Sequence, residues 1–405
     1  MEAGTVIVGA GHSGGLAATF LRQFGYVGRI TLLGEEPLPP YQRPPLSKTW
    51  LKGRASDTSL ALRSAQWYLE NNVVLELGRP VTAIDAAGRE VSIGTDRRPF
   101  EHLIIATGSR PRLLEVPGCD LAAILTLRTV ADAEAIRDAF ALASHVAIIG
   151  GGYVGLEVAA TARSLGLEVV VIEREERLLA RVAGPEIAAF FQRFHEDRGT
   201  TFLTDATVER FEGREGRVSG VRLTDGRLIA AGVVVVGIGA IPNDELARGA
   251  GLATANGIVV DLDARTSQRD IFAIGDVAFR PLPHFSVETR LESVPNATEQ
   301  ARQAAAAITG LDRHPQEIPW FWSDQFDLKL QIAGMPGDSD SMVWRGQPDS
   351  SKFAIFHLSD RRIQAVEAVN SPAEFMGGKL LIAARAQVLP ERLADPGISM
   401  KDVAG

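Results

Sequence analysis

The sequence predicts an α/β fold with two Rossmann-like dinucleotide-binding domains and a C-terminal α+β domain. Three observations lead to this prediction. A strand–GxGxxG–helix pattern occurs twice, at residues 5–25 and 145–166, and each copy is followed by an apolar strand that ends in a carboxylate. After residue 319, a tryptophan-rich segment precedes the strand-like runs "KFAIFHL" and "RIQAVEAV". A chain of 405 residues is long enough for two to three such domains.

Composition narrows the class of protein. Hydrophobic residues make up 45% and charged residues 23% of the chain, which is typical of a globular protein with a large core. The net charge of −8 argues against a general nucleic-acid surface. The first residues lack the basic and apolar regions of a secretory signal, and the longest apolar stretches are too short to span a membrane. We therefore expect a cytoplasmic protein that binds neither nucleic acid nor membrane.

The first repeat has every part of a dinucleotide-binding unit. The strand "TVIV" leads into Gly9, Gly11 and Gly14, and the later strand "RITLLGE" ends at Glu35. In this motif the first glycine permits a tight turn, the second lets a pyrophosphate approach the backbone, and the third lets helix and strand pack closely. The helix N-terminus offers N–H groups to the phosphates, and the acid accepts hydrogen bonds from a ribose.

The second repeat has the same parts in the same order. Gly150, Gly152 and Gly155 follow "HVAII", and the strand "EVVVIER" carries Glu173. One GxGxxG alone is weak support, because a glycine-rich turn can be merely structural. Two complete copies indicate two dinucleotide sites. A carboxylate at Glu173 favours NADH, although the adjacent Arg174 is able to accept the 2′-phosphate of NADPH.

Later segments extend the pattern. "TDG" at 224–226 predicts a hairpin turn. Small-residue turns, at 106–108 and 237–239, end the buried strand of each copy. A further strand is expected to end at Gly275-Asp276, where the Asp276 carboxylate either contacts a sugar-like hydroxyl chain or is an ordinary capping residue. A helix is expected from about Pro295–Thr298 to a glycine stop at Gly310.

The segment "YQRPPLSK" at 41–48 is basic, aromatic and stiffened by prolines, and we expect a non-helical loop. It contains no cysteine. Cys119 is the chain's single cysteine, which excludes a disulfide framework, a CxxC pair and a cysteine-ligated cluster, and we interpret it as a linker residue.

Together these motifs resemble the FAD-dependent pyridine nucleotide-disulfide oxidoreductase superfamily, with its glutathione-reductase-like architecture, over essentially the whole chain. Members that use a redox cysteine carry it near the "YQRPPLSK" segment. "RPPLSK", "ESVPNATEQAR" and "PWFWSDQ" instead resemble the oxygenase-coupled, putidaredoxin-reductase-like NADH:ferredoxin reductases. The resemblance implies FAD and NADH as cofactors and a 2Fe–2S ferredoxin as partner, with hydride accepted by FAD and electrons passed on singly.

The resemblance also implies site residues. Those expected at FAD are Gly9, Gly11, Ser13, Gly14, Glu35, Arg43, Lys48, Val81, Ala106, Gly108, Arg128, Asp276, Val294 and Trp320. Those expected at NADH are Gly150, Gly152, Gly155, Glu157, Glu173, Arg181 and Gly239. No metal is expected. His12, inside the first loop, is interpreted as a variable position.

Lys48, Glu157 and Trp320 are the residues expected to serve catalysis. Lys48 and Glu157 are expected to form a charge pair across the domain seam, and a tryptophan of "PWFWSDQ" is expected near the exposed flavin edge. The alternatives are a surface lysine, a helix acid stabilised by the dipole, and a core aromatic residue.

The order of motifs sets the expected domains. The FAD domain is discontinuous, over 1–113 and 243–318; the NAD domain occupies 114–242, and the C-terminal domain 319–405. A monomer or weak dimer is expected. An acidic ferredoxin needs a basic docking patch, for which Arg63, Arg302 and Lys329 are candidates.

Two other functions stay open on the sequence. One is an NADH oxidase or peroxidase, although this chain lacks the redox thiol that such an enzyme would need. The other is a sensing or interaction flavoprotein similar to apoptosis-inducing factor, which the missing targeting segment and basic tail disfavour.

Overall fold

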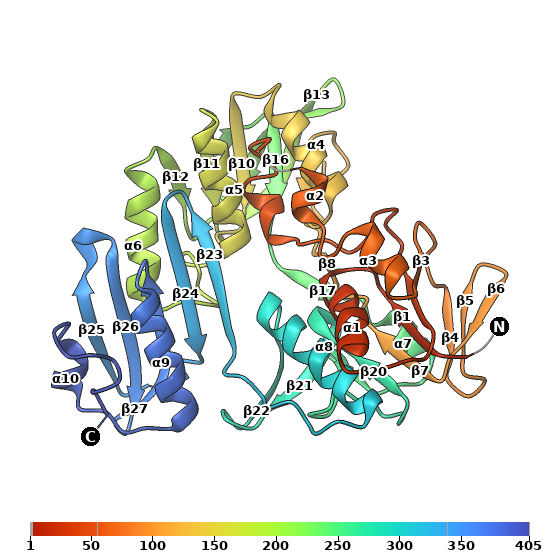
Figure 1. Ribbon diagram of the computed structural model, residues 1–405. Coiled ribbons are helices and arrows are strands. Elements are labelled where there is room, and N and C mark those ends of the chain that lie inside the picture. Colours follow the sequence, from red (N-terminus) through yellow and green to blue (C-terminus); the bar gives the residue numbers. More distant parts are fainter. Residues whose placement is uncertain (1–2, 55, 338, 405) are drawn as a thin grey trace. The chain divides into compact units, whose positions relative to one another are not determined.

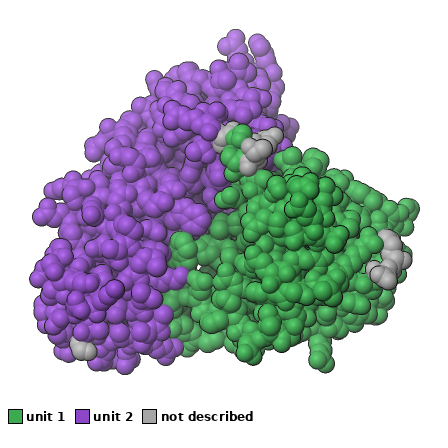
Figure 2. Space-filling view, viewed as in Figure 1, with its two compact units in different colours: residues 1–43, 56–110, 241–320 green, residues 44–55, 111–240, 321–405 purple. Residues whose placement is uncertain are grey.

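The computed structural model describes residues 3–54, 56–337 and 339–404, which form two compact units (Figure 2). The first unit comprises Met1–Arg43, Ser56–Arg110 and Ile241–Trp320. The second comprises Pro44–Ala55, Pro111–Ala240 and Phe321–Gly405. The proline-rich segment therefore groups with the second unit, although the residues on both sides of it belong to the first.

The first unit is built on a parallel five-stranded sheet in the order β20-β7-β1-β2-β3 (Figure 1). Its strands are β1 (Thr5–Val8), β2 (Ile30–Leu33), β3 (Val73–Glu76), β7 (His102–Ile105) and β20 (Ile271–Ala273). Every residue of β1 and β2 is buried, because elements cover both faces of the sheet. Ile7 packs with helices α1 (His12–Gln23) and α8 (Val294–Thr309). Val6 and Val8 pack with the antiparallel sheet β4 (Ala83–Asp85), β5 (Glu90–Ile93) and β6 (Asp96–Pro99).

The second unit repeats this plan. Its parallel sheet has the order β12-β11-β10-β16-β9. The strands are β9 (Ile124–Thr126), β10 (His145–Ile149), β11 (Glu168–Ile172), β12 (Thr200–Leu203) and β16 (Val233–Val236). Helices α4 (Val130–Phe140), α5 (Tyr153–Ser164) and α6 (Pro185–Glu196) pack against it, as does an antiparallel sheet of β13 (Val208–Arg214), β14 (Arg217–Leu223) and β15 (Leu228–Ala230). The two predicted Rossmann-like folds and the hairpin at 224–226 are confirmed.

The C-terminal part of the second unit is an antiparallel sheet with the strand order β23-β24-β27-β26-β25 (Figure 1). Its elements are β23 (Trp320–Gln325), β24 (Leu328–Gly334), β25 (Ser341–Gln347), β26 (Lys352–Ser359), β27 (Arg362–Val369) and the helix α9 (Pro372–Ala384). The strands predicted at "KFAIFHL" and "RIQAVEAV" are β26 and β27. Ile187 and Phe191 of α6 share one apolar core with Leu330 and Phe353 of this sheet.

Shorter elements complete the fold. They are β8 (Ser109–Pro111), β17 (Ala240–Pro242), β18 (Thr254–Ala255), β19 (Gly257–Val259), β21 (Ala278–Leu282), β22 (Val287–Arg290), α2 (Asp57–Leu60), α3 (Ala65–Glu70), α7 (Glu245–Gly249), α10 (Pro390–Ala394), η2 (Gly275–Val277) and η3 (Pro348–Ser350).

Two local predictions can be compared with the structure directly. The expectation of a non-helical loop at 41–48 is wrong for its centre, because Pro44–Ser47 forms the 3₁₀ turn η1. Proline fits the first positions of such a turn, where its missing N–H has no partner to lose. The helix expected to end at Gly310 is confirmed as α8, and Gly310 caps it with a φ of +71°.

Candidate functional site

The first glycine loop, which leads into α1, is closed against the backbone at two of its glycines and less crowded at the third. Gly9 has a φ of +113°, and a Cβ there would lie 2.2 Å from the Ala106 carbonyl oxygen. A Cβ on Gly14 would lie 2.0 Å from the Gly9 carbonyl oxygen, so the loop closes tightly only with glycine. At Gly11, by contrast, the nearest atom to a Cβ is the Arg43 guanidinium, at 3.8 Å. The helix has no side-chain N-cap, so its first N–H groups are available to a phosphate.

Asp276 lies beside this loop. Gly275 has a φ of +76°, and a Cβ there would lie 2.7 Å from Ser13 Oγ. Ser109 Oγ donates a hydrogen bond of 3.2 Å to Asp276 Oδ2. The structure thus brings Ser13 close to Gly275, the residue before Asp276, although the sequence places them 262 positions apart.

His12 is a part of this site that the sequence interpretation passed over. Its ring is largely buried, and its Nδ1 has no hydrogen-bond partner among the described residues. Burial lowers the pKa of His12 from 6.5 to about 4; Asp276 opposes that change and Arg43 adds to it. A polar ligand at the glycine loop would give this buried ring nitrogen a hydrogen-bond partner. Its place between two loop glycines was the signal available in the sequence.

Glu35, the acid predicted to bind a ribose after strand β2, is a surface residue, and the acid beside it is the one that contacts Arg43. Glu35 is exposed, whereas its neighbour Glu36 is half-buried. Glu36 accepts a hydrogen bond of 2.6 Å from the Tyr41 hydroxyl and forms an ion pair of 3.0 Å with Arg43. Glu36 therefore orients Arg43, which lies next to the glycine loop. The doubled acid "EE" was the only sign of this role in the sequence.

Helix α8 begins in the same unit at Val294. The preceding Ser293 caps it by accepting a hydrogen bond of 3.3 Å from the Asn296 N–H. Gln300, one turn further along, accepts a hydrogen bond of 2.8 Å from the Gly275 N–H. The helix therefore fixes the backbone that carries Asp276.

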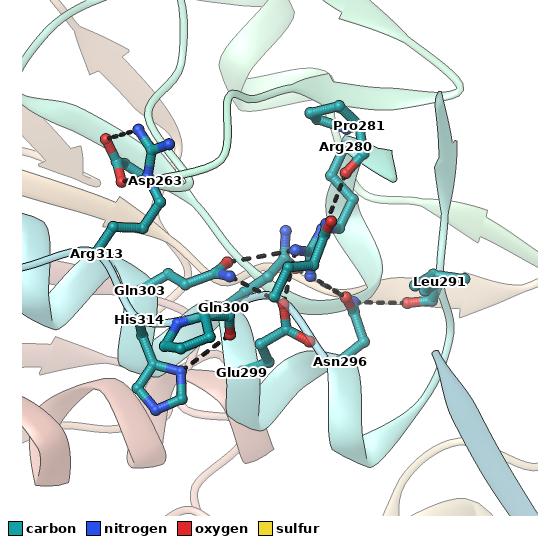
Figure 3. Close-up of polar contacts among 12 residues, drawn as sticks. Asp263, Arg280, Pro281, Leu291, Asn296, Glu299, Gln300, Gln303, Arg313 and His314 are labelled. Carbon is teal, nitrogen blue, oxygen red and sulfur yellow. Dashed lines mark hydrogen bonds and ion pairs between the residues drawn. The ribbon is translucent and has the colours of Figure 1, made fainter. Parts of the chain in front are cut away.

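A buried polar network holds this helix (Figure 3). Arg280 forms an ion pair of 2.8 Å with Glu299 and donates a hydrogen bond of 2.8 Å to Asn296 Oδ1. Gln303 donates to the same Glu299 oxygen at 2.9 Å. Because the Arg280 side chain is only 2% exposed, its charge depends on these partners.

The other residues predicted at FAD lie on several elements of the two units. In the first unit, Ala106 is buried after β7, Gly108 has a φ of +65°, Val81 packs against the core, and Trp320 is half-buried. Arg128 belongs to the second unit, where its backbone N–H donates to Asp132 Oδ2 at 3.0 Å.

The second glycine loop has the same geometry as the first. Gly150 has a φ of +106°, and a Cβ on it would lie 2.4 Å from the Gly237 carbonyl oxygen. A Cβ on Gly155 would lie 2.3 Å from the Gly150 carbonyl oxygen, whereas one on Gly152 would meet nothing within 4 Å. Helix α5 also begins without a side-chain cap. Both loops therefore have the shape and the free N–H groups that a dinucleotide pyrophosphate requires.

Glu173 lies at the edge of the second loop. Its carboxylate accepts hydrogen bonds from the N–H of Gly151, at 2.6 Å, and of Glu175, at 2.8 Å. Arg174 is exposed and pairs with Glu175 at 2.8 Å. The structure therefore holds the carboxylate in place, as selection for a ribose 2′-hydroxyl would require.

Arg181 and Gly239 lie together in the same unit. The Arg181 guanidinium is 3.2 Å from the position of a Cβ on Gly239, which has a φ of +108°. The sequence interpretation assigned both to the NADH site without predicting that they are neighbours.

Lys48 and Glu157 form an ion pair of 2.7 Å. Glu157 lies in the first turns of α5 and its side chain is 5% exposed, while that of Lys48 is 18% exposed. Ser47 Oγ donates a hydrogen bond of 2.5 Å to the same oxygen, Glu157 Oε2. Ser323 Oγ donates one of 2.8 Å to the other, Oε1. The sequence interpretation named the pair but missed both serines.

The three candidate residues for ferredoxin docking differ in how far their charged groups are exposed. Arg302 lies over the Phe20 ring at 4.9 Å, and Arg63 lies over Trp67 at 5.8 Å. Lys329 is 54% exposed and pairs with Asp324 at 3.5 Å. Of the three, Lys329 presents its charge most fully.

Other classes of site are not found in the part of the chain that the structure describes. No group of three or more histidine, cysteine or acidic residues there could hold a metal ion. Cys119 is exposed. None of the helices there has the length and apolar character needed to cross a membrane.

Known proteins and protein families are similar to this chain over nearly its whole length. A sequence profile described as "Pyridine nucleotide-disulphide oxidoreductase" matches residues 4–301, and one described as "Reductase C-terminal" matches residues 320–404. The "Probable ferredoxin reductase CtmF" of Castellaniella defragrans is 47% identical over 98% of both chains.

Two solved structures are similar over nearly their full length. The ferredoxin reductase for the CYP199A2 system from Rhodopseudomonas palustris superposes with a TM-score of 0.96, at 40% identity, over 100% of both chains. A covalent complex of putidaredoxin reductase with putidaredoxin gives a TM-score of 0.96 at 38% identity, over 99% of this chain and 98% of that one.

Proposed function

The chain belongs to the pyridine nucleotide-disulphide oxidoreductase family, and from this membership we propose that it is an FAD-dependent NADH:ferredoxin reductase. It takes hydride from NADH and passes single electrons to a 2Fe–2S ferredoxin that serves a monooxygenase or dioxygenase. The single observation that carries this function is the pair of tight glycine loops, each leading into a helix without a side-chain cap, in a chain without a cysteine in the segment 41–48. Full-length similarity to ferredoxin reductases supports the same acceptor.

FAD, when bound, supplies the conversion of a two-electron hydride into single electrons. The chain's own part is to bind, orient and balance charge. The free N–H groups of α1 and α5 bind two pyrophosphates, and the partial positive charge at each helix N-terminus favours them. Arg43, held by Glu36, adds positive charge beside the first loop.

We assign the two sets of predicted residues to the two loops. FAD is assigned to Gly9, Gly11, Ser13, Gly14, Glu35, Arg43, Lys48, Val81, Ala106, Gly108, Arg128, Asp276, Val294 and Trp320. NADH is assigned to Gly150, Gly152, Gly155, Glu157, Glu173, Arg181 and Gly239. The contacts of Ser13 with the Gly275 loop and of Arg181 with Gly239 support these sets. In this proposal the Lys48–Glu157 pair serves the NADH side of the flavin.

The corresponding domains are an FAD domain over 1–113 and 243–318, an NAD domain over 114–242 and a C-terminal domain over 319–405. Each of the first two contains one parallel sheet, and the third coincides closely with the matched range 320–404. We place the protein in the cytoplasm, as a monomer or weak dimer, with Lys329 as the favoured docking cation.

One experiment tests the function. The purified protein is expected to be yellow, and its flavin absorbance is expected to bleach when NADH is added without oxygen. A 2Fe–2S ferredoxin should then be reduced at a rate proportional to the amount of enzyme, with little oxygen consumed in its absence. A colourless protein contradicts the proposal. Rapid oxygen or peroxide consumption without ferredoxin would indicate an oxidase or peroxidase, and stable reduction without turnover would indicate a sensor.

A further inference from the structure

We propose that Ser323 and Gln325, in the C-terminal sheet, are positioning residues for the Lys48–Glu157 ion pair. The inference rests on the proposed function, in which that pair serves the NADH side. A continuous line of hydrogen bonds runs from His195 of α6 through Gln325 and Ser323 to the Glu157 carboxylate. All of its members belong to the second unit.

Strand β23 carries the middle of this line on one face. Successive side chains of a strand point to opposite faces, so Ser323 and Gln325 share one face while Trp320 and Trp322 share the other. Ser323 and Gln325 are both completely buried, whereas the tryptophans are half-buried. The same strand that presents the tryptophans therefore also reaches the ion pair.

The hydrogen bonds of this line all run in one direction, from donor to acceptor toward Glu157. Ser323 Oγ donates to Glu157 Oε1 at 2.8 Å, and Gln325 Nε2 donates to Ser323 Oγ at 3.1 Å. Gln325 Oε1 lies 2.9 Å from His195 Nε2. The His195 ring is fully buried, which lowers its pKa to about 4, so the ring is neutral. Because an amide oxygen can only accept, the proton of the neutral ring is assigned to Nε2, which donates it to Gln325 Oε1. Each donor in the line thus points toward the carboxylate.

The end of the line completes the bonding of Glu157. Its Oε2 already accepts hydrogen bonds from Ser47 Oγ and the Lys48 ammonium. Ser323 supplies the donor for Oε1. Because a buried carboxylate oxygen without a donor is unfavourable, loss of the Ser323 hydroxyl is expected to turn the carboxylate away and release Lys48.

Ser47 and Lys48 also have hydrogen bonds that do not involve Ser323, so loss of Ser323 should affect the ion pair specifically. Thr161 Oγ1 donates a hydrogen bond of 2.8 Å to the Ser47 carbonyl oxygen, and Lys48 Nζ donates one of 3.1 Å to the Pro44 carbonyl oxygen. The turn η1 is therefore anchored independently of Ser323. Removal of the Ser323 hydroxyl should change the orientation of the ion pair and leave the turn in place.

The first readout is Lys48 itself. In the holoenzyme without NADH, Ser323→Ala is expected to raise the rate at which an amine-specific acetylating reagent modifies Lys48 by at least about threefold, measured by peptide mass spectrometry. The exposed Lys352 is the internal reference. Gln325→Met removes the amide donor one step further away and should act in the same direction with a smaller effect.

The second readout is the NADH half-reaction. Anaerobic bleaching by subsaturating NADH is expected to slow about tenfold in Ser323→Ala, the size expected for one hydrogen bond to a charged group. Ser323→Thr, which keeps the hydroxyl, should recover the rate to within about twofold. Oxidation of the reduced protein by ferricyanide should be unchanged in both variants.

Thr200→Val is the matched control. The Thr200 hydroxyl is buried in the same unit and has no hydrogen-bond partner within the described ranges of the chain, so its removal should change neither readout. Unchanged Lys48 modification in both Ser323→Ala and Gln325→Met, or an equal loss of rate in Thr200→Val, overturns the inference. Failure of NADH to bleach the wild type instead overturns the proposed function, and Lys48 modification still decides whether the line of hydrogen bonds orients the pair.

Discussion

Glu173 connects the structure of the second glycine loop with the nucleotide preference that we propose. Its carboxylate oxygens accept hydrogen bonds from the Gly151 and Glu175 N–H groups, which hold the loop and aim the negative charge. A fixed negative charge accepts hydrogen bonds from a 2′-hydroxyl and repels a 2′-phosphate. The preference for NADH over NADPH is therefore expected to depend on the charge at this position more than on its hydrogen-bonding capacity.

Glu173→Gln tests that expectation. The amide oxygen still accepts one loop N–H, but the repulsive charge is gone, so the ratio of kcat/KM for NADH to that for NADPH is expected to fall about tenfold or more. Ferricyanide reduction with each nucleotide measures it. Glu176→Gln, at an exposed acid three residues further along, is the matched control, and a similar fall in that variant would contradict the assignment.

The roles of Glu35 and Glu36 cannot be distinguished from the sequence alone. The sequence places a carboxylate at the end of β2 in either case, but only the structure distinguishes the exposed Glu35 from the Glu36 that pairs with Arg43. Two adjacent acids have the same propensities. Their roles differ because one of them meets side chains from a different segment.

At the scale of elements, α8 depends on the charged network beneath it. Arg280→Met is expected to lower the free energy of unfolding by about 3–5 kcal/mol, because Glu299 is then left buried without its partner. Urea unfolding measures the loss. The double variant Arg280→Met/Glu299→Gln should lose less than the single variant, since no unpaired charge is then buried.

Arg313→Gln provides the comparison for that prediction. Arg313 also pairs with a carboxylate, that of Asp263 (Figure 3). Its side chain, however, is 52% exposed. An exposed ion pair contributes at most about 1 kcal/mol. Equal losses for Arg280→Met and Arg313→Gln would show that burial is not what makes the network important.

The second glycine loop can be tested apart from the first. Gly155→Ala would place a Cβ 2.3 Å from the Gly150 carbonyl oxygen, so the start of α5 must move away from the loop. The variant is expected to stay yellow and to bleach with dithionite, but its bleaching rate with subsaturating NADH should fall at least about tenfold, the loss expected when phosphate-binding N–H groups are misplaced.

Gly232→Ala is the control for Gly155→Ala within the same unit. A Cβ there would meet only the Ala143 side chain, at 3.8 Å, which is an ordinary contact. It should bleach as the wild type does. Loss of the bound flavin in Gly155→Ala would instead mean that the two loops do not serve separate cofactors.

At the scale of the whole molecule, a fully buried histidine links stability to pH. The pKa of His195 is about 4 in the folded chain, against 6.5 for an ordinary histidine, because burial disfavours the charged ring. Between these values the unfolded chain binds a proton that the folded chain rejects, so the free energy of unfolding falls as the pH decreases. From pH 7 to 5, His195 should account for about 2 kcal/mol of that fall.

His195→Asn isolates this contribution. The asparagine does not titrate, so the decline in unfolding free energy between pH 7 and 5 is expected to be about 2 kcal/mol smaller than in the wild type. Urea unfolding at both pH values gives the difference. Parallel declines in the two proteins would show that the ring is protonated equally in both states.

The sequence by itself determined the repeated plan of this protein. Strands, glycine loops, hairpin and the stop of α8 follow from backbone constraints and from apolar patterns within about twenty residues, and these operate wherever the segment lies. Only the tertiary structure decided which polar side chains meet. Ser47 and Ser323 reach Glu157 across 110 and 166 residues of chain, and hydroxyls of this kind carry no local signal because their partners are set by the packing of separate elements.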